Sequence, residues 1–400
     1  MREVPISARP HVFYIRPAPG WLDLLHQEVL AKVASPLQKY KFEPKVTLLK
    51  GTVKLHRCDW RQGLEIMLRL NTAHDVEWMI LESKCNKWTE VDAILQRVPW
   101  DEIIPDRSLP IHVTADVRQG FTTASGKLRE RLCEAAKATH VTEGANYRFK
   151  IELRSDFLRV SVSLCGSPLY KRGYKATLTA TAPLPEHHAA ACSTWVLELL
   201  QPQEKVSAVF IPFAGTGTLG FESLIVLSGS GPGAFLRTFS CDLFPCVSKA
   251  SMGFFRKKLS ERLTSAEHPK LIFNEINPEA THVLKSNTDV FIKGYECQII
   301  QGDFFEAQPK LPEDGVVLIL LNPPFGDRLG KSSSISALYS RLGSRLREIS
   351  EGSGAKIMGG CLCPDSTTWK RFTSDLKAPL VETHHFTHGG KEMRIVRWRS

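Results

Sequence analysis

The chain has 400 residues, and its 52 Lys and Arg against 42 Asp and Glu give a formal net charge of +10. A hydrophobic fraction of 42% and a charged fraction of 24% are ordinary for globular proteins, which excludes disordered, collagenous and disulfide-scaffold chains. The longest strongly apolar run, 316–321, is far shorter than the roughly 18–20 residues of a membrane-spanning helix. The length favours two or three domains. The positive net charge has two equally weighted explanations, a polyanionic partner or an enzyme that is merely basic.

The ten cysteines are too sparse for a disulfide framework and form no Cys-x-x-Cys pair. We therefore expect free thiols in a reducing intracellular compartment, either the cytoplasm or the mitochondrial matrix. His384, His385 and His388 lie close together but have no acidic or cysteine partner at ligand spacing, so no metal site is expected.

Short strands and helices alternate over residues 1–165, which predicts an α+β module. The helix at 21–33, for example, places Leu22, Leu25 and Val29 on one face. The other predicted helices are 61–70, 90–97 and 127–137, and the strands are 12–15, 46–49, 53–55, 75–81, 109–116, 149–153 and 157–164.

A linker and a connecting helix occupy residues 166–195. From Val206 the pattern changes to apolar strands that are each followed by a turn and a helix. This pattern is typical of α/β proteins and predicts a doubly wound, Rossmann-like parallel sheet.

A glycine-containing loop follows the first strand of this sheet, 206–211. Its sequence from Pro212 to Thr218 is PFAGTGT, and a helix follows at 219–227. Gly215 and Gly217 allow a tight turn that a ligand can approach closely, and the helix N-terminus offers free N–H groups. The loop lacks the Gly-Lys-Ser/Thr of a phosphate loop and the third glycine of a dinucleotide fingerprint.

Two further predicted strands, 237–241 and 297–301, end close to an acid. Asp242 follows the second predicted strand, where an acid can accept hydrogen bonds from ribose hydroxyls, and Asp303 follows the third. Ligands of open α/β sheets bind at the carboxyl ends of the strands, so these acids and the glycine loop should face one site. The long span between the two acids suggests an insertion around 260–295.

The fourth predicted strand, 316–321, ends in Asn322-Pro323-Pro324-Phe325. The two prolines keep the backbone extended and remove two donors, which leaves the Asn322 side-chain oxygen and the Pro323 carbonyl to accept from an exocyclic amine. Such hydrogen bonds turn the amine lone pair toward a methyl electrophile. Phe325 can stack on the base, a contact worth roughly 1–3 kcal/mol. The alternative is a rigid surface turn.

At these residues the chain resembles the THUMP-containing RNA methyltransferases of class I fold, in particular the large-subunit rRNA guanine-N2 methyltransferases. The segment NPPFGDRLG at 322–330 is similar to the family's catalytic loop. The segment LYKRGYK at 169–175 is similar to its junction between the RNA-binding and catalytic parts. The resemblance covers nearly the whole chain. Arg172 belongs to the junction motif, and a solvated linker arginine is the alternative interpretation.

The resemblance implies four parts: a ferredoxin-like domain at 1–70, a THUMP RNA-binding domain at 71–165, the linker and helix at 166–195, and a methyltransferase domain at 196–400. It also implies S-adenosylmethionine as the cofactor. Carried over to this sequence, the residues that hold the methionine end of the cofactor are Pro212, Ala214, Gly215 and Gly217. Asp242 would bind the ribose and Asp303 the adenine amine. The target base would be held by the catalytic residues Asn322, Pro323, Pro324 and Phe325.

The expected reaction is transfer of a methyl group to the N2 amine of a guanosine in large-subunit rRNA or a pre-ribosomal particle. The family pattern has Asp before the proline of the glycine loop, whereas this chain has Ile211. A catalytically weak or inactive homologue that binds rRNA as a ribosome assembly factor is therefore an alternative. A tRNA guanine-N2 methyltransferase is another, and the N-terminal module disfavours a DNA adenine methyltransferase.

Overall fold

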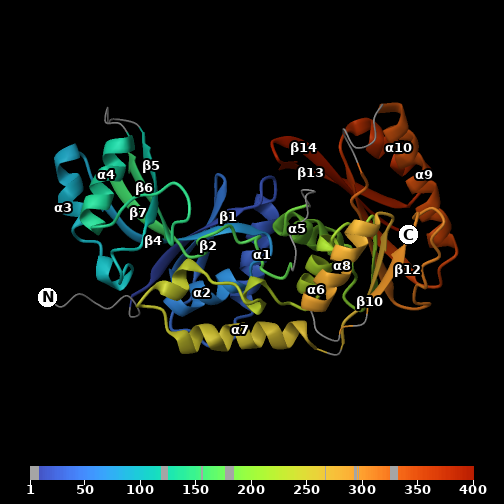
Figure 1. Cartoon of the computed structure of the whole chain (residues 1–400), viewed down its shortest axis with the longest axis horizontal. Coiled ribbons are helices and arrows are strands. Elements are labelled where there is room, and N and C mark those ends of the chain that lie inside the picture. Colours follow the sequence, from blue (N-terminus) through green and yellow to red (C-terminus); the bar gives the residue numbers. More distant parts are fainter. Residues whose placement is uncertain are drawn as a thin grey trace. The chain divides into compact units, whose positions relative to one another are not determined.

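The computed structural model describes residues 9–118, 125–154, 156–175, 184–265, 267–291, 295, 297–324 and 332–400, with the side chains of 332–334 excepted (Figure 1). The chain divides into two compact units. Unit 1 consists of Met1–Pro17, Leu25–Lys171 and Leu236–Lys258. Unit 2 consists of Ala18–Leu24, Arg172–Phe235 and Leu259–Ser400.

Unit 1 is built on a seven-stranded sheet in the order β2-β3-β1-β4-β7-β6-β5. Its strands are β1 (His11–Pro17), β2 (Lys45–Leu49), β3 (Thr52–Cys58), β4 (Ala73–Lys84), β5 (Ile111–Val117), β6 (Tyr147–Arg154) and β7 (Phe157–Ser163). Its helices are α2 (Trp60–Arg69), α3 (Val91–Leu95), α4 (Ser125–Ala136), most of α1 (Leu22–Ala34) and most of α7 (Lys249–Leu263).

The elements from β1 to β4 follow the βαββαβ order of ferredoxin-like units. The strand β4 pairs with β1 on one side and with β7 on the other, so the sheet continues without a break past residue 70. Side chains alternate between its faces. Phe13 and Ile15 are fully buried on the face that α2 covers, where Gly63 of α2 lies against the Phe13 ring.

Unit 2 contains the predicted doubly wound sheet, in the order β10-β9-β8-β11-β12-β14-β13. The strands are β8 (Val206–Pro212), β9 (Lys270–Glu275), β10 (Cys297–Gln301), β11 (Val316–Leu321), β12 (Lys356–Cys363), β13 (Leu380–His388) and β14 (Lys391–Arg399). The helices are α5 (Glu186–Leu197), α6 (Thr218–Leu227), α8 (Pro278–Phe291), α9 (Ser332–Glu351) and α10 (Ser366–Leu376). The strands β8 to β12 run parallel, and β14 runs antiparallel to β12 and β13.

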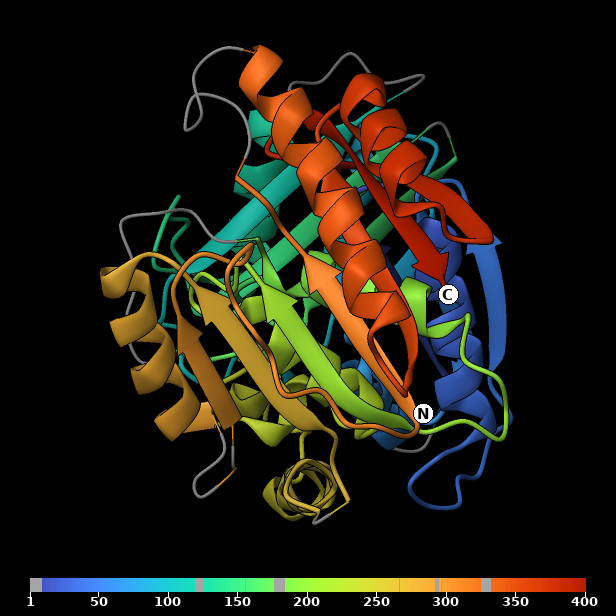
Figure 2. The same ribbon diagram turned by 90° about the vertical axis from the view of Figure 1, so that its right-hand side faces the viewer.

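Helices cover both faces of the unit 2 sheet, because alternate strand residues are apolar on both sides. Phe210 of β8 belongs to the apolar cluster under α9 and α10, whereas its neighbours Val209 and Ile211 belong to the cluster that includes α5, α6 and α8. Figure 2 shows α9 and α10 crossing in front of the sheet. None of the described helices is long and apolar enough to cross a membrane.

The prediction of a second strand at 237–241 is wrong. Residues Ser240–Leu243 form a 3₁₀ turn that belongs to unit 1, and the strand beside β8 is β9, Lys270–Glu275. Residues 260–295, predicted to be an insertion, instead supply β9 and α8. The physical reason is burial: Leu271, Ile272 and Phe273 are at most 1% exposed, as required for a strand that is covered on both faces.

The segment Leu236–Lys258 is held on unit 1 by a cluster around Phe239. The guanidinium groups of Arg237 and Arg256 lie 4.8 and 5.1 Å from the centre of the Phe239 ring. Arg237 also donates to the carbonyl oxygens of Pro168 and Lys171, each at 2.8 Å. The carboxylate of Asp242 accepts a hydrogen bond from Arg256 at 2.9 Å. These contacts give Asp242 a structural role in unit 1.

Arg172 lies in the interior of unit 2, so the interpretation as a solvated linker arginine is wrong. Its guanidinium pairs with Glu222 of α6 at 3.2 Å, and both side chains are 0% exposed. The Tyr174 hydroxyl donates to the same carboxylate at 3.0 Å. Charged groups are almost never fully buried unless they are paired, and this buried pair joins the junction segment to α6.

We expect Glu204 to make the stability of the protein depend on acidic pH. Its carboxylate accepts from Arg399 at 2.5 Å and from Lys356 at 2.9 Å, and these two hydrogen bonds lower its pKa from 4.5 to about 2. Since the pKa is lower in the folded state, the ionised carboxylate stabilises the fold above pH 4.5, and this contribution is lost as the pH falls toward 2.

The measurement is the thermal midpoint across this pH range for the wild type and Glu204→Gln. The midpoint of the wild type should fall more steeply with acidification than that of the variant, because glutamine does not titrate. Parallel pH profiles for the two proteins would contradict the assignment.

Candidate functional site

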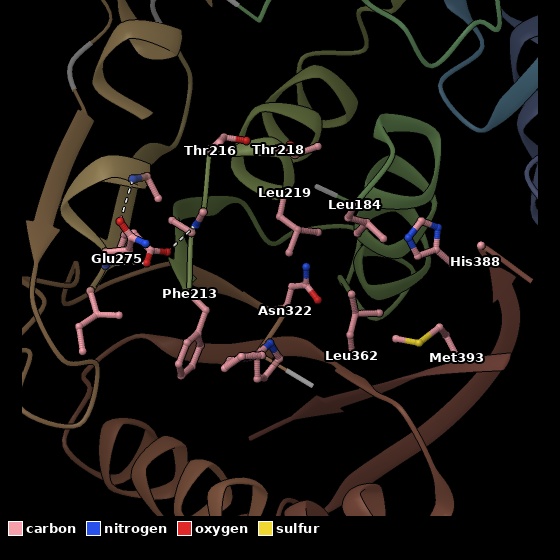
Figure 3. A pocket seen from close by; sticks show the side chains of 18 of the residues that line it. Leu184, Phe213, Thr216, Thr218, Leu219, Glu275, Asn322, Leu362, His388 and Met393 are labelled. Carbon is pink, nitrogen blue, oxygen red and sulfur yellow. Dashed lines mark hydrogen bonds between the residues drawn. The ribbon is translucent and has the colours of Figure 1, made fainter. Parts of the chain in front are cut away.

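A cavity of about 580 Å³ lies in unit 2 where β8, β9 and β11 end (Figure 3). Figure 3 shows Asn322 between Glu275 on one side and His388 on the other. The lining residues are Leu184, Phe213, Ala214, Gly215, Thr216, Thr218, Leu219, Glu275, Ile276, Asn277, Ala280, Asn322, Pro323, Pro324, Leu362, His388, Gly389, Lys391 and Met393.

The loop after β8 needs its glycines for two different reasons. Gly217, the N-cap of α6, has a φ of 92°, and a Cβ there would come within 2.6 Å of Leu284 and Phe221. Gly215 has a φ of 55°, but a Cβ on it would meet no atom within 4 Å. Gly217 is therefore required for packing, whereas Gly215 leaves open space beside the cavity. Phe213 also has a positive φ, of 58°, which is uncommon for a residue with a side chain.

Glu275 is the last residue of β9, and its side chain binds the glycine loop. Its carboxylate accepts from the Gly215 N–H at 2.7 Å and from the Asn277 N–H at 2.9 Å. The Ala214 N–H donates to the Asn274 carbonyl at 2.9 Å, which ties the loop to β9 a second time. Each carboxylate oxygen of Glu275 keeps a further lone pair, so the group can still accept hydrogen bonds from a ligand.

Ile276 follows Glu275 and is an exposed apolar side chain on the cavity wall, with 61% of its surface exposed. Asn277 then caps α8, because its side-chain oxygen accepts from the Glu279 N–H at 2.8 Å. The cavity therefore presents an acceptor and an apolar face side by side, a combination that suits a nucleoside with a hydroxylated sugar and a flat base.

Asn322 follows β11, a strand whose six residues are all buried. The Oδ1 atom of Asn322 is buried and has no hydrogen-bond partner among the described residues. An unpaired buried acceptor costs roughly 1–3 kcal/mol, so this atom is suited to a donor that arrives with a ligand. Pro323 and Pro324 have no N–H, so the chain offers no backbone donor at these two positions. The hydroxyls of Thr216 and Thr218 are buried and unpaired in the same way.

The β13–β14 hairpin forms the opposite side of the cavity. His388 and Lys391 pair across a turn made of Gly389 and Gly390, whose φ values of 57° and 76° are those of a tight hairpin turn. Met393 of β14 also lines the cavity. Burial lowers the pKa of His388 from 6.5, so its imidazole is neutral at pH 7 and has one donor and one acceptor nitrogen.

Trp21 packs against the β13–β14 hairpin. Its indole stacks on His384 with 4.2 Å between ring centres, and its N–H donates to Nδ1 of His188 at 3.2 Å. The ring of His188 lies edge-on to His388, with 5.6 Å between centres. These contacts pack the hairpin against Trp21 and His188.

The structure brings some of the predicted site residues together and separates others. Ala214, Gly215, Asn322, Pro323 and Pro324 line the cavity. Pro212 and Gly217 lie at the two ends of the glycine loop and do not line the cavity. Phe325 lies outside the described residues.

The two predicted acids lie elsewhere. Asp242 belongs to unit 1, so its predicted place at the end of the second sheet strand is wrong. Asp303 follows β10 as predicted, but it is exposed and does not line the cavity, and its carboxylate accepts from the Phe305 N–H at 3.0 Å.

Glu275 is the main residue that sequence reasoning missed. It follows the apolar run 271–273 and precedes a turn with asparagine and proline, which is a usable signal of a strand end. The assignment of a strand at 237–241 made this segment look like an insertion. His388 and Lys391 were also missed, although the intervening Gly389-Gly390 is a recognisable hairpin signal.

Comparison with known proteins yields one family match. Residues 182–374 match the family model UPF0020, described as RMKL-like, methyltransferase domain. The "Ribosomal RNA large subunit methyltransferase K/L" of Shewanella frigidimarina is 29% identical over 56% of this chain and 30% of its own length. The "Putative RNA methyltransferase YpsC" of Bacillus subtilis is 25% identical over 69% of this chain and 72% of its own length. The chain spans about a third of the length of the K/L relatives.

Solved structures show the same fold over nearly the whole chain. SMU.472, "a putative methyltransferase complexed with SAH", covers 98% of both chains with a TM-score of 0.75 and 16% identity. TrmN from Thermus thermophilus covers 98% of this chain and 100% of its own, with a TM-score of 0.64 and 16% identity. The predicted class I methyltransferase fold is confirmed by this likeness together with the strand order of unit 2.

Proposed function

We propose that this chain transfers a methyl group from S-adenosylmethionine to the N2 amine of a guanosine in large-subunit rRNA, since residues 182–374 match the family model UPF0020, RMKL-like, methyltransferase domain. The observation that carries the proposal is the buried, unpaired Oδ1 of Asn322 at the cavity wall, beside Pro323 and Pro324. An acceptor without a partner, next to two residues without N–H groups, suits an exocyclic amine.

The Glu275 side of the cavity fits the methyl donor. Glu275 would accept from the ribose hydroxyls, Ile276 would lie against the adenine, and Ala214 and Gly215 would line the methionine end. The open space beside Gly215 supports this orientation, since a side chain there would occupy it. The contact between Asp303 and the adenine amine remains a prediction. When bound, S-adenosylmethionine supplies an electrophilic methyl group.

The side of the cavity toward the β13–β14 hairpin fits the target base. Asn322 Oδ1 and the Pro323 carbonyl would accept from the amine and direct its lone pair toward the donor, so the chain acts by positioning and polarisation. Leu362 and Met393 would pack on the base, and the neutral His388 would meet its edge. The base must leave its stack to enter, at a cost of a few kcal/mol.

The names of the K/L and YpsC relatives support an RNA substrate, and the K/L names support large-subunit rRNA. Ile211 is fully buried in the apolar cluster of unit 2, so it supplies no carboxylate to the loop. Glu275 supplies the acid instead, through its hydrogen bond to the Gly215 N–H. Because Glu275 provides the carboxylate that is missing at Ile211, we favour an active enzyme over the inactive assembly factor.

Donor binding, measured by calorimetry, tests the proposal. The wild type should bind S-adenosylmethionine, and Glu275→Gln should weaken binding about 10-fold or more, because hydrogen bonds to a charged group are worth roughly 1.5–3 kcal/mol each. Asp242→Asn is the control, since Asp242 contacts Arg256 in unit 1 and not the cavity.

A loss of binding in Asp242→Asn with normal binding in Glu275→Gln would overturn the assignment of the ribose acid. Absence of binding by the wild type at millimolar donor would overturn the enzyme itself and favour the assembly factor. Transfer to tRNA but not to rRNA would overturn the proposed substrate.

A further inference from the structure

We propose that Lys391, at the tip of the β13–β14 hairpin, selects guanine by donating hydrogen bonds to O6 and N7 of the base whose N2 amine Asn322 holds. This inference rests on the proposed function. It deepens that function by naming the residue that distinguishes guanine from the other bases with an exocyclic amine. Lys391 and Asn322 line the same cavity of unit 2.

Strand register places the hairpin tip and Asn322 on the same face of the unit 2 sheet. Side chains alternate along a strand, and directly opposite residues on paired strands share a face. Five residues of β11 to β14 belong to the apolar cluster that includes α5, α6 and α8: Leu320, Leu362, Phe386, Met393 and Ile395. Asn322, Lys391 and His388 each lie two positions from one of these residues in the chain, and all three line the cavity.

The spacing between Asn322 and the hairpin tip suits a base. The parallel register of β11 and β12 sets Asn322 level with Leu362, and Leu362 pairs with Ile395 of β14. Lys391 lies four residues beyond Ile395, so its backbone is about 13 Å farther along the strand direction and two strand spacings, about 10 Å, to the side. The asparagine and lysine side chains cover part of this distance, and a purine with a hydrogen bond on each side fits the remainder.

The cavity wall between these two positions is apolar. Leu362 and Met393 line it and are 1% and 4% exposed. Figure 3 shows both side chains on the side of Asn322 that His388 occupies. Leucine and methionine can pack against the face of a base but offer its edges no strong hydrogen bond. The polar contacts of the base therefore fall to Asn322 at one end and to the hairpin tip at the other.

The ammonium group of Lys391 is available to a ligand. The side chain is exposed and forms no hydrogen bond or ion pair with the part of the chain that the structure describes. Its cross-strand neighbour is His388. Burial lowers the pKa of His388, so this neighbour is uncharged at pH 7 and does not repel the ammonium group. Glu392 pairs with Thr387, and strand alternation places both on the opposite face.

Guanine has hydrogen-bonding groups that match the two ends of this site. When its N2 amine points toward Asn322, O6 and N7 lie on the far side of the purine, and both are acceptors. Lysine carries three donors and no acceptor, and its contact with O6 and N7 is among the commonest specific contacts to guanine. Lys391 can therefore satisfy the edge that Asn322 does not reach.

Adenine and cytosine also carry an exocyclic amine but do not match the hairpin tip. Adenine with its N6 amine at Asn322 turns N3 and the sugar toward Lys391, and cytosine with its N4 amine there turns the sugar toward it. Neither base presents two acceptors to the ammonium group. A site that is built to hydrogen-bond its substrate strongly rejects an analogue that lacks the matching groups.

The test compares two transcripts of large-subunit rRNA as methyl acceptors for the full chain, one with guanosine and one with 7-deazaguanosine throughout. The analogue keeps the N2 amine and the Watson–Crick edge but has C–H in place of N7. On guanosine, kcat/KM of the wild type should exceed that of Lys391→Met about 10- to 100-fold. On 7-deazaguanosine the ratio should approach 1, because part of the contact is already lost. Any effect of the analogue on RNA folding cancels in this ratio.

Lys370→Met is the matched control, since Lys370 is an exposed lysine of α10 that does not line the cavity. It should behave as the wild type on both transcripts. A ratio of wild type to Lys391→Met that is the same on both transcripts would assign Lys391 to a phosphate or to the hairpin fold and would overturn the proposal. Methylation of adenosine or cytidine, detected by mass spectrometry of the digested RNA, would also overturn it.

Nucleotide binding separates this inference from the proposed function. The fluorescent 2-aminopurine riboside, which has the amine and N7 but lacks O6, reports occupation of the cavity. Guanosine monophosphate should displace it from the wild type about 10-fold more effectively than 7-deazaguanosine monophosphate, and equally from Lys391→Met. If this pattern holds without methyl transfer, the proposed reaction fails and the role of Lys391 stands. If methyl transfer occurs and the two nucleotides displace the probe equally or not at all, the reaction stands and the role of Lys391 fails.

Discussion

Replacing Asn322 with alanine is expected to lower the rate of methyl transfer roughly 100- to 1,000-fold, the range found when one preorganised polar group is removed from an active site. The structural reason is that Oδ1 is buried at the end of a rigid strand and has no partner within the described chain. It is therefore placed in advance for a donor from the substrate. Because the polarisation occurs as the amine reacts, the loss should fall on kcat more than on KM.

Asn322→Asp is the matched variant, since it keeps an acceptor oxygen at nearly the same place. It should recover a large part of the activity, whereas Asn322→Ala should not. The donor affinity of both variants, measured by calorimetry, should stay close to that of the wild type, because the proposal assigns donor binding to Glu275 and the glycine loop. Unchanged turnover in Asn322→Ala would refute the proposed role of this side chain.

The second large effect is expected on stability. Arg172→Met should lower the free energy of unfolding by about 3–5 kcal/mol, the usual loss when one partner of a buried ion pair is removed. Arg172 and Glu222 are both fully buried, and removal of the arginine leaves the carboxylate with the Tyr174 hydroxyl. Burial already raises the pKa of Glu222, and that penalty grows when the neighbouring positive charge is lost.

Urea unfolding of the single variants and of the Arg172→Met, Glu222→Leu double variant measures this loss. The double variant should be more stable than Arg172→Met alone, since no charge is then left buried. Arg131→Met provides the control, because its pair with Asp92 is 41% and 51% exposed and should contribute at most about 1 kcal/mol. Equal losses for Arg172→Met and Arg131→Met would show that burial does not strengthen this pair.

Much of unit 2 could be predicted because its signals are local. The run from Val316 to Leu321 is apolar throughout, as a central parallel strand requires, and Asn322 follows it directly. The glycine loop is also recognisable from the nearby sequence alone, because a strand, a turn and a helix follow one another there. These two features lie at neighbouring strand ends because β8 pairs with β11, so predicting the sheet was enough to predict that they meet.

Other parts of the site depend on contacts that the local sequence does not contain. His388 and Lys391 reach the cavity only because β14 inserts between β12 and β13, a reversal of chain order. The assignment of Asp242 failed because residues 237–241, RTFSC, alternate polar and apolar side chains before an acid, as a half-buried strand does. What distinguishes β9 is burial on both faces, which depends on α6 and α9, far away in the sequence.

The double pairing of β4 has a consequence for how unit 1 unfolds. A fragment that ended at residue 70 would lose β4 and leave β1 as an unpaired edge, with a row of free N–H and C=O groups that invites aggregation. A fragment that began at residue 71 would keep β4 but expose its other edge in the same way. The two halves of the sheet therefore form one cooperative unit, in which amide hydrogens of β4 should exchange with solvent only when the whole sheet opens.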